Sequence, residues 1–97
     1  MTNINIVFDG EFDDVDIIAV PDNITNNIVD ISKEFLEWVC VVKGGSYTKT
    51  VNGHTYINAE TDGFIEWLNS YYCTGFKKAY VVARNTSYHP LYKSIEF

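Results

Sequence analysis

The chain has 97 residues, of which 46% are hydrophobic and 15% aromatic, and its formal net charge is −6 at pH 7. This apolar content excludes a disordered chain, and the length allows one buried core but not two. We therefore expect a single domain covering residues 1–97. The negative charge argues against a general attraction to nucleic acid or to an anionic membrane surface.

Targeting and redox signals point to a cytoplasmic protein. The N-terminus lacks the basic region and apolar run of a signal peptide. No stretch approaches the roughly 18 apolar residues that a membrane-spanning helix needs. Cys40 and Cys73 have neither metal-site spacing nor the number needed for a disulfide framework. We expect both thiols to be reduced.

The first hairpin is predicted near the N-terminus. Apolar and polar residues alternate over residues 3–8, which predicts a strand with one buried face. Asp9-Gly10 is a favoured hairpin turn. The return strand is expected to begin at Phe12 or Val15 and to end at Val20, because Pro21 lacks the N–H that a ladder needs.

A long amphipathic helix is predicted next, with Asp22 or Asn23 as its N-cap. The pattern also allows a break at residues 30–32, with Ser32 as a second cap. Gly44-Gly45 is expected to end the helix. Nearly five turns follow a 3.6-residue period, carried by Ile24, Ile28, Ile31, Phe35, Trp38, Val39 and Val42.

A second hairpin and helix follow. Asn52-Gly53 favours a type I′ turn, since both of its residues must adopt positive φ. Strands are expected on either side of this turn, over residues 47–51 and 54–59. The remaining expected elements are a helix over residues 61–72 capped by Thr61, a short central strand over 79–83 and a last strand over 91–97.

Two helical segments repeat one motif, in which a Phe, a Trp and an aliphatic residue stand at i, i+3 and i+4. That spacing places the three side chains on one helical face. We expect both faces to bury in a shared core, which leaves Glu37 and Glu66 toward solvent. The predicted fold is therefore α+β, in the order ββα-ββα-ββ, with a mainly antiparallel sheet and two helices on one face. The motif residues are Phe35, Trp38 and Val39, and Phe64, Trp67 and Leu68.

The negative charge is concentrated in the first half of the chain. Residues 1–45 hold nine acidic and two basic residues, whereas residues 46–97 hold four acidic and five basic residues. Such an asymmetry predicts an acidic face for a basic partner, although an acidic surface also serves solubility alone. The predicted partner-binding residues are Asp9, Glu11, Asp13, Asp14, Asp16 and Asp22.

Other chemistries find less support. The acidic stretch lacks the Gly at position 6 and the Glu at position 12 of an EF-hand loop, so we expect no metal or other cofactor. Tyr and Lys residues interleave in the last third, but no RNP motif accompanies them, so direct nucleic-acid binding is not expected. A Tyr-rich interface with another protein is the better interpretation of the last third of the chain. Neither His54 nor His89 has a nucleophile or carboxylate at a sequence spacing that would indicate a catalytic pair, so we do not expect an enzyme.

These observations favour a non-enzymatic module that blocks the basic, nucleic-acid-binding surface of a protein such as a nuclease. In size and charge, the chain is similar to phage and mobile-element inhibitors that act against host defence and to bacterial immunity proteins, without a shared motif. Two alternatives stay open. One is a small-ligand or nucleotide-binding protein with its pocket between sheet and helices. The other is a homo-oligomeric structural component that pairs an edge strand and exposed Tyr residues between copies.

Overall fold

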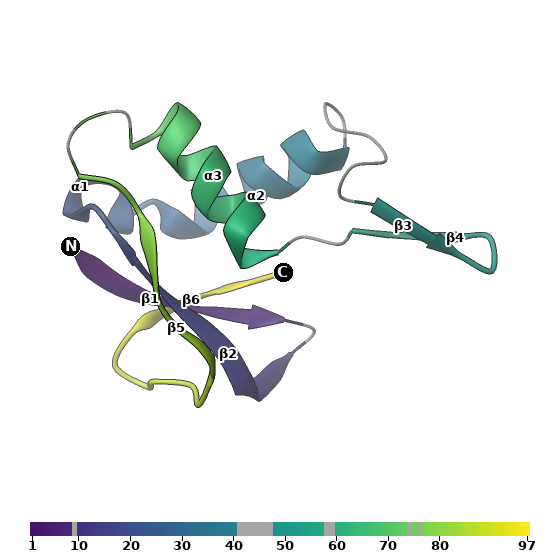
Figure 1. Ribbon diagram of the computed structural model, residues 1–97, viewed down its shortest axis with the longest axis horizontal. Helices are drawn as coiled ribbons and strands as arrows, with labels where there is room; N and C mark the ends of the chain where they lie inside the picture. The colour runs from purple at the N-terminus through teal and green to yellow at the C-terminus, as the bar shows by residue number, and fades with distance from the viewer. Residues whose placement is uncertain (9, 41–47, 58–59, 74, 76) are drawn as a thin grey trace.

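A four-stranded sheet carries the helices on one of its faces (Figure 1). In order across the sheet, the strands are β5 (Tyr80–Thr86), β2 (Glu11–Val20), β1 (Thr2–Phe8) and β6 (Lys93–Glu96). The helices are α1 (Asp22–Thr25), α2 (Ile28–Trp38) and α3 (Thr61–Tyr71). The predicted α+β fold is confirmed. The structure, a computed structural model, describes residues 1–8, 10–40, 48–57, 60–73, 75 and 77–97.

Two of the three strand pairings in the sheet are antiparallel, as expected. β1 and β2 form the predicted first hairpin, with Thr2 opposite Val20 at one end and Phe8 opposite Glu11 at the other. β2 also pairs antiparallel with β5, whereas β1 pairs parallel with β6. β5 and β6 therefore run in the same direction on opposite sides of the hairpin. The segment that joins them, residues 87–92, has to cross a face of the sheet and is called the crossing segment below.

The helix-side core is built on the two repeated motifs. The rings of Phe35 and Phe64 are fully buried, with their centroids 5.2 Å apart in an edge-to-face arrangement. Trp67 packs 5.5 Å from Phe35, and Phe97 from the C-terminal end packs 5.6 Å from it. These rings bring α2, α3 and the end of the chain together over the sheet. The sheet contributes Ile4, Ile6, Ile18, Val20 and Ile95 to the same cluster.

The opposite face of the sheet is covered as well, so the expectation that β1 buries only one face is wrong. Asn5 is fully buried on this face, and its amide holds the crossing segment. The Asn5 Nδ2 donates to the carbonyl of His89 at 2.9 Å, and its Oδ1 accepts the His89 N–H at 3.1 Å. Burial of this polar side chain is tolerated because both of its ends are bonded. Tyr88 and Tyr92 then pack on a second cluster of Val7, Val15 and Ile17.

The expected long helix is divided earlier than its pattern allowed. The break falls at Asn26 and Asn27 between α1 and α2, not at residues 30–32. Asn side chains favour turns over helix interiors, which is consistent with this position. Ser32 lies inside α2, where its hydroxyl donates to the carbonyl of Val29 at 2.6 Å instead of capping a helix. The expected stop at Gly44-Gly45 lies outside the described residues.

Neither of the predicted side-chain caps forms. The N-cap position of α1 is Pro21, and Asp22 occupies the first turn, where its charge suits the helix dipole. The N-cap position of α3 is Glu60, which makes no side-chain cap bond. Thr61, the expected cap, is buried and bonds to the sheet instead.

The apolar run expected as a central strand, residues 79–83, begins an edge strand. Tyr80 and Val82 of β5 are about half exposed, and β5 lies at one side of the sheet. Its pairing with β2 shifts register twice. Asn85 stands at the shift between Ala83 and Thr86 and adopts φ +51°, a conformation that Asn tolerates better than most residues. Shifts of this kind are typical of edge strands, where they hinder pairing with other chains.

The second predicted hairpin forms, but as a sheet of its own. β3 (Thr48–Val51) and β4 (His54–Ile57) pair antiparallel around Asn52 and Gly53. The φ values of +52° and +80° at these two residues fit the predicted type I′ turn. The hairpin stands away from the main sheet and the helices (Figure 1). The outer ends of the two expected strands, residues 47 and 58–59, lie outside the described residues.

The aromatic cluster should dominate stability. Because Phe35 is fully buried against four other aromatic rings, Phe35→Ala is expected to lower the free energy of unfolding by about 3–5 kcal/mol. The control is Leu91→Ala, because that side chain is 87% exposed and should change stability by less than about 0.5 kcal/mol. Urea unfolding measures both. Equal costs for the two variants would contradict this description of the core.

Candidate partner-binding surface

The first four residues of β2 form an exposed acidic segment, Glu11–Asp14. All four side chains are exposed, and three of them are carboxylates. Gly10 precedes the segment at φ +73°, which allows the tight turn from β1. The segment therefore ends just before Val15, the residue at which β2 begins to pair with Thr86 of β5.

The carboxylates of the acidic segment form no ion pair in the described part of the chain. The two ion pairs found there involve other acids. Asp22 contacts the amino terminus at 3.2 Å, and Asp62 contacts Arg84 at 2.6 Å. Lysines and arginines of the described second half thus leave Glu11, Asp13 and Asp14 uncompensated. This is the arrangement that an external basic surface could neutralise.

Phe12 adds an apolar group in the middle of the acidic segment. Its side chain is 49% exposed, and its ring meets that of Tyr88 edge-to-face at 5.3 Å. The Tyr88 N–H also donates to the carbonyl of Phe12 at 3.1 Å. The crossing segment therefore fixes the backbone of the acidic segment while it leaves half of an aromatic ring open to solvent.

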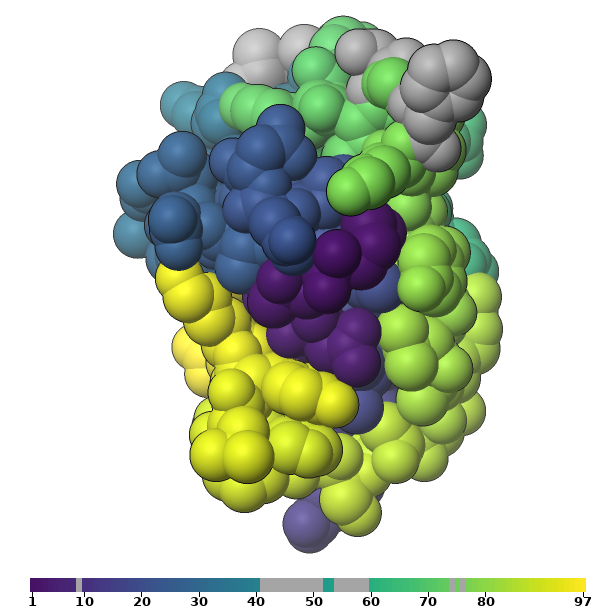
Figure 2. All heavy atoms as spheres, turned by 90° about the vertical axis from the view of Figure 1, so that its left-hand side faces the viewer, coloured from purple at the N-terminus to yellow at the C-terminus, as the bar shows by residue number. Residues whose placement is uncertain are grey.

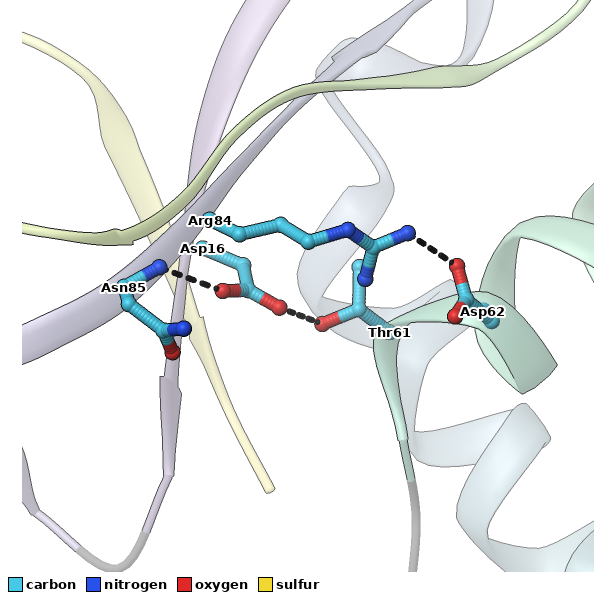
Figure 3. Close-up of polar contacts among 5 residues, drawn as sticks. All are labelled: Asp16, Thr61, Asp62, Arg84 and Asn85. Atoms are coloured by element: carbon cyan, nitrogen blue, oxygen red, sulfur yellow. Dashed lines mark hydrogen bonds and ion pairs between the residues drawn. The ribbon is translucent and has the colours of Figure 1, made fainter.

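Asp16 belongs to a different environment, although it was predicted with the same partner-binding set. Its side chain is only 9% exposed. Oδ2 accepts the hydroxyl of Thr61 at 2.5 Å, and Oδ1 accepts the N–H of Asn85 at 3.1 Å (Figure 3). Asp16 thus joins β2 to the irregular part of β5 and to the first residue of α3. Arg84 and Asp62 form their ion pair beside this bridge, linking β5 to α3 a second time (Figure 3).

Asp22 also stands apart from the acidic segment. Asp22 follows the far end of β2, about 30 Å of extended strand from Glu11. The hydroxyl of Thr2 bonds to it at 2.7 Å, and this bond together with the amino-terminal ammonium lowers the pKa of Asp22. Asp9 lies outside the described residues. Of the five predicted residues that the structure describes, Glu11, Asp13 and Asp14 therefore lie together, and Asp16 and Asp22 lie elsewhere.

Two features of this surface were missed by the sequence reasoning, and one had a signal. Asp16 stands beside Val15 and Ile17 at the start of an almost continuous apolar run to Val20, which is typical of a strand covered on both faces, so its burial could have been inferred. The pairing of Phe12 with Tyr88 joins residues 76 positions apart in the sequence. No local pattern connects those two rings.

Other polar groups considered from the sequence have structural surroundings. His89 stacks on Tyr92 at 3.9 Å, and its Nδ1 accepts the N–H of Leu91 at 3.3 Å. Glu37 and Glu66 are exposed, as expected. Among the described residues, no three His, Cys, Asp or Glu side chains are grouped so as to hold a metal ion. The side chain of His54 lies outside the description.

A shallow groove of about 450 Å³ lies at the other end of the sheet. Figure 2 looks onto this side, where the first strand, in purple, runs between the helical region in blue and the C-terminal segment in yellow. The groove is open to solvent, and its walls come from the start of β1, the end of α1 and the start of β6. It is lined by Met1, Thr2, Asn3, Thr25, Leu91, Tyr92 and Lys93.

Comparisons with known proteins give no relative from which a function could be taken. No protein-family model matches the chain, and no curated protein or solved structure matches it. Among the described residues, no helix is long and apolar enough to cross a membrane.

The different surroundings of Asp16 and of the acidic segment predict that similar substitutions have different effects on stability. Asp16→Ala leaves the Thr61 hydroxyl and the Asn85 N–H without their acceptor, so it should lower the free energy of unfolding by about 1–3 kcal/mol. Asp14→Ala removes an exposed carboxylate and should cost less than about 0.5 kcal/mol. Urea unfolding of both variants tests this, and a neutral Asp16→Ala would show that the bridge is not structural.

Proposed function

We propose that this protein is a non-enzymatic binding module whose acidic segment docks on the basic surface of a partner protein. The observation that carries the proposal is the exposure of three carboxylates that no base of the described chain compensates. Surfaces rich in Arg and Lys are typical of nucleases and other nucleic-acid-binding proteins. Carboxylates along a strand can pair with the side chains that otherwise contact phosphates. Binding there would block the partner by occlusion.

The geometry of the acidic segment supports this use. Glu11 and Asp13 are two residues apart on a strand, which places their Cα atoms about 6.5 Å apart. Phe12 adds a half-exposed ring beside these carboxylates, and buried aromatic rings are common anchors at the centres of interfaces. Because Tyr88 holds this backbone, little order has to be gained on binding.

An inhibitor of this kind fits the roles considered from the sequence. A phage or mobile-element protein that acts against host defence, or an immunity-type protein, would meet its nuclease in the cytoplasm and block it without chemistry. The net charge of −6 would raise the association rate with a basic partner. It would also keep the protein itself off nucleic acid.

The acidic segment can be tested against a control variant of equal net charge. Asp13→Lys with Asp14→Lys reverses two charges in the segment, and Glu37→Lys with Glu66→Lys reverses two exposed charges on the helices. We expect immobilised wild-type protein and the helix variant to capture the same basic, nucleic-acid-binding protein from a lysate. The segment variant should lose it. Quantitative mass spectrometry of the captured proteins compares the three.

The association rate with the captured protein provides a second measurement. Because exposed charges are screened by salt, the rate should fall steeply between about 50 mM and about 500 mM salt. Surface plasmon resonance measures this dependence. Salt-independent binding, equal losses in the two variants or the absence of any basic partner would each count against the proposal.

A small-ligand function is the second candidate, and the open groove favours it. A volume of about 450 Å³ falls within the range of ligand sites. A ligand that binds the folded state raises the melting temperature. A thermal-shift screen with nucleotides therefore tests this candidate, and a rise that Lys93→Ala removes would support it.

A further inference from the structure

Four strands of the described chain have an outer edge without a strand partner: β3, β4, β5 and β6. Three of them carry features that hinder pairing with another chain. β5 has two register shifts and Arg84, β6 has Lys93 and Glu96 among only four residues, and β3 has Lys49. β4, by contrast, reads His-Thr-Tyr-Ile, without Asp, Glu, Lys or Arg and without a register shift. It is the unprotected edge of this set.

The hairpin that contains β4 lacks a third strand among the described residues. It stands away from the main sheet, as Figure 1 shows. A two-stranded hairpin is marginally stable in water, and three or more strands are usually needed for a stable sheet. Its sequence nevertheless favours strands strongly, with Thr, Val, Tyr and Ile around a type I′ turn. These facts together indicate a strand partner from another molecule.

The ladder fixes which backbone groups face the open edges. In a hairpin with a two-residue turn, the pair that closes the turn exchanges both hydrogen bonds, and the pairs then alternate. Val51 and His54 close this turn, so the next pair, Thr50 and Thr55, turns its N–H and C=O groups outward. The same holds for the pair of Thr48 and Ile57. Each four-residue strand therefore offers two outward-facing residues.

We propose that β4 pairs antiparallel with β4 of a second copy, so that two hairpins form one four-stranded sheet across a two-fold axis. The register that uses every outward group places Thr55 opposite Ile57 of the second copy, and Tyr56 opposite its own equivalent. These are aliphatic, hydroxyl and aromatic pairs, which stabilise sheets. The equivalent register for β3 would place Lys49 opposite Lys49, and like charges directly opposite each other are destabilising. The self-complementarity of β4 identifies a second copy as the occupant.

This dimer does not depend on the proposed function. It involves the β3–β4 hairpin, whereas the inhibitor proposal uses the acidic segment at the start of β2. A monomeric protein could still be an inhibitor, and a dimer could exist without one. If both proposals hold, each dimer presents two acidic segments to its partners.

The hairpin supplies its own matched control, because Thr50 and Thr55 are opposite each other and both turn outward. Thr55→Pro removes an N–H that the proposed pairing uses, while Thr50→Pro removes one on the edge that it leaves free. Sedimentation velocity from low to high micromolar protein should show a reversible dimer for the wild type and for Thr50→Pro. For Thr55→Pro the dissociation constant should rise at least about tenfold.

A crosslink tests the register without relying on proline. In a Cys40→Ser background, which removes the exposed thiol, Tyr56→Cys places two thiols opposite each other across the two-fold axis. Cβ atoms of directly opposed residues lie close enough for a disulfide. Oxidised Tyr56→Cys should run as a covalent dimer on a non-reducing gel, and Lys49→Cys should remain monomeric.

The proposal is overturned if the wild type stays monomeric at every concentration. It is also overturned if Thr50→Pro and Thr55→Pro weaken the dimer equally, or if Lys49→Cys crosslinks as well as Tyr56→Cys. Circular dichroism of each variant distinguishes a lost contact from a lost fold. A variant that unfolds is replaced by Tyr56→Lys, which sets two like charges opposite each other and should also give a monomer.

Discussion

The packing of Phe35 is the contact on which the rest of the molecule depends. Its ring is fully buried and meets Phe64 and Trp67 of α3 as well as Phe97 near the C-terminus. One side chain of α2 thus connects a second helix and the end of the chain over the sheet. With both helices held on that face, the crossing segment closes the other face through Asn5. The β1–β2 hairpin lies between these two layers, and the first four residues of β2 are exposed.

That arrangement explains why an acidic stretch of one strand has two different roles. Near the middle of β2 the strand is covered on both faces, so a carboxylate there has to be satisfied internally. Asp16 meets this requirement through Thr61 and Asn85. A few residues earlier the cover ends, and the carboxylates of Glu11–Asp14 face solvent. The same residue type therefore stabilises the fold at one position and is exposed to solvent at another.

The fold class could be predicted because its signals are local. The 3.6-residue period, the Asn52-Gly53 turn and the repeated motif each depend on neighbouring residues, and they predicted helices and hairpins that the structure contains, although the first helix is divided at Asn26 and Asn27. Strand positions depend on contacts between distant residues, which explains why the run over residues 79–83 was wrongly expected at the centre of the sheet. The buried second face of β1 was missed for the same reason, since it depends on His89 and Tyr92.

The candidate site was predictable only in part. Composition indicated where negative charge gathers, and Glu11, Asp13 and Asp14 are indeed exposed. Composition does not distinguish an exposed carboxylate from one that accepts two internal hydrogen bonds, as Asp16 does. Nor does it show that Asp22 lies at the far end of the sheet, beside the amino terminus. These distinctions require the register of β1 against β2 and the position of α3.

Carboxyl footprinting with a carbodiimide and an amine, read by mass spectrometry, tests the central claim most directly. In the free protein, Glu11, Asp13 and Asp14 should be labelled as readily as Glu37 and Glu66, while Asp16 should be protected. With the captured partner bound, labelling should fall at Glu11, Asp13 and Asp14 and stay unchanged at Glu37 and Glu66. Unchanged labelling of the acidic segment in the complex, or ready labelling of Asp16 in the free protein, would contradict the account.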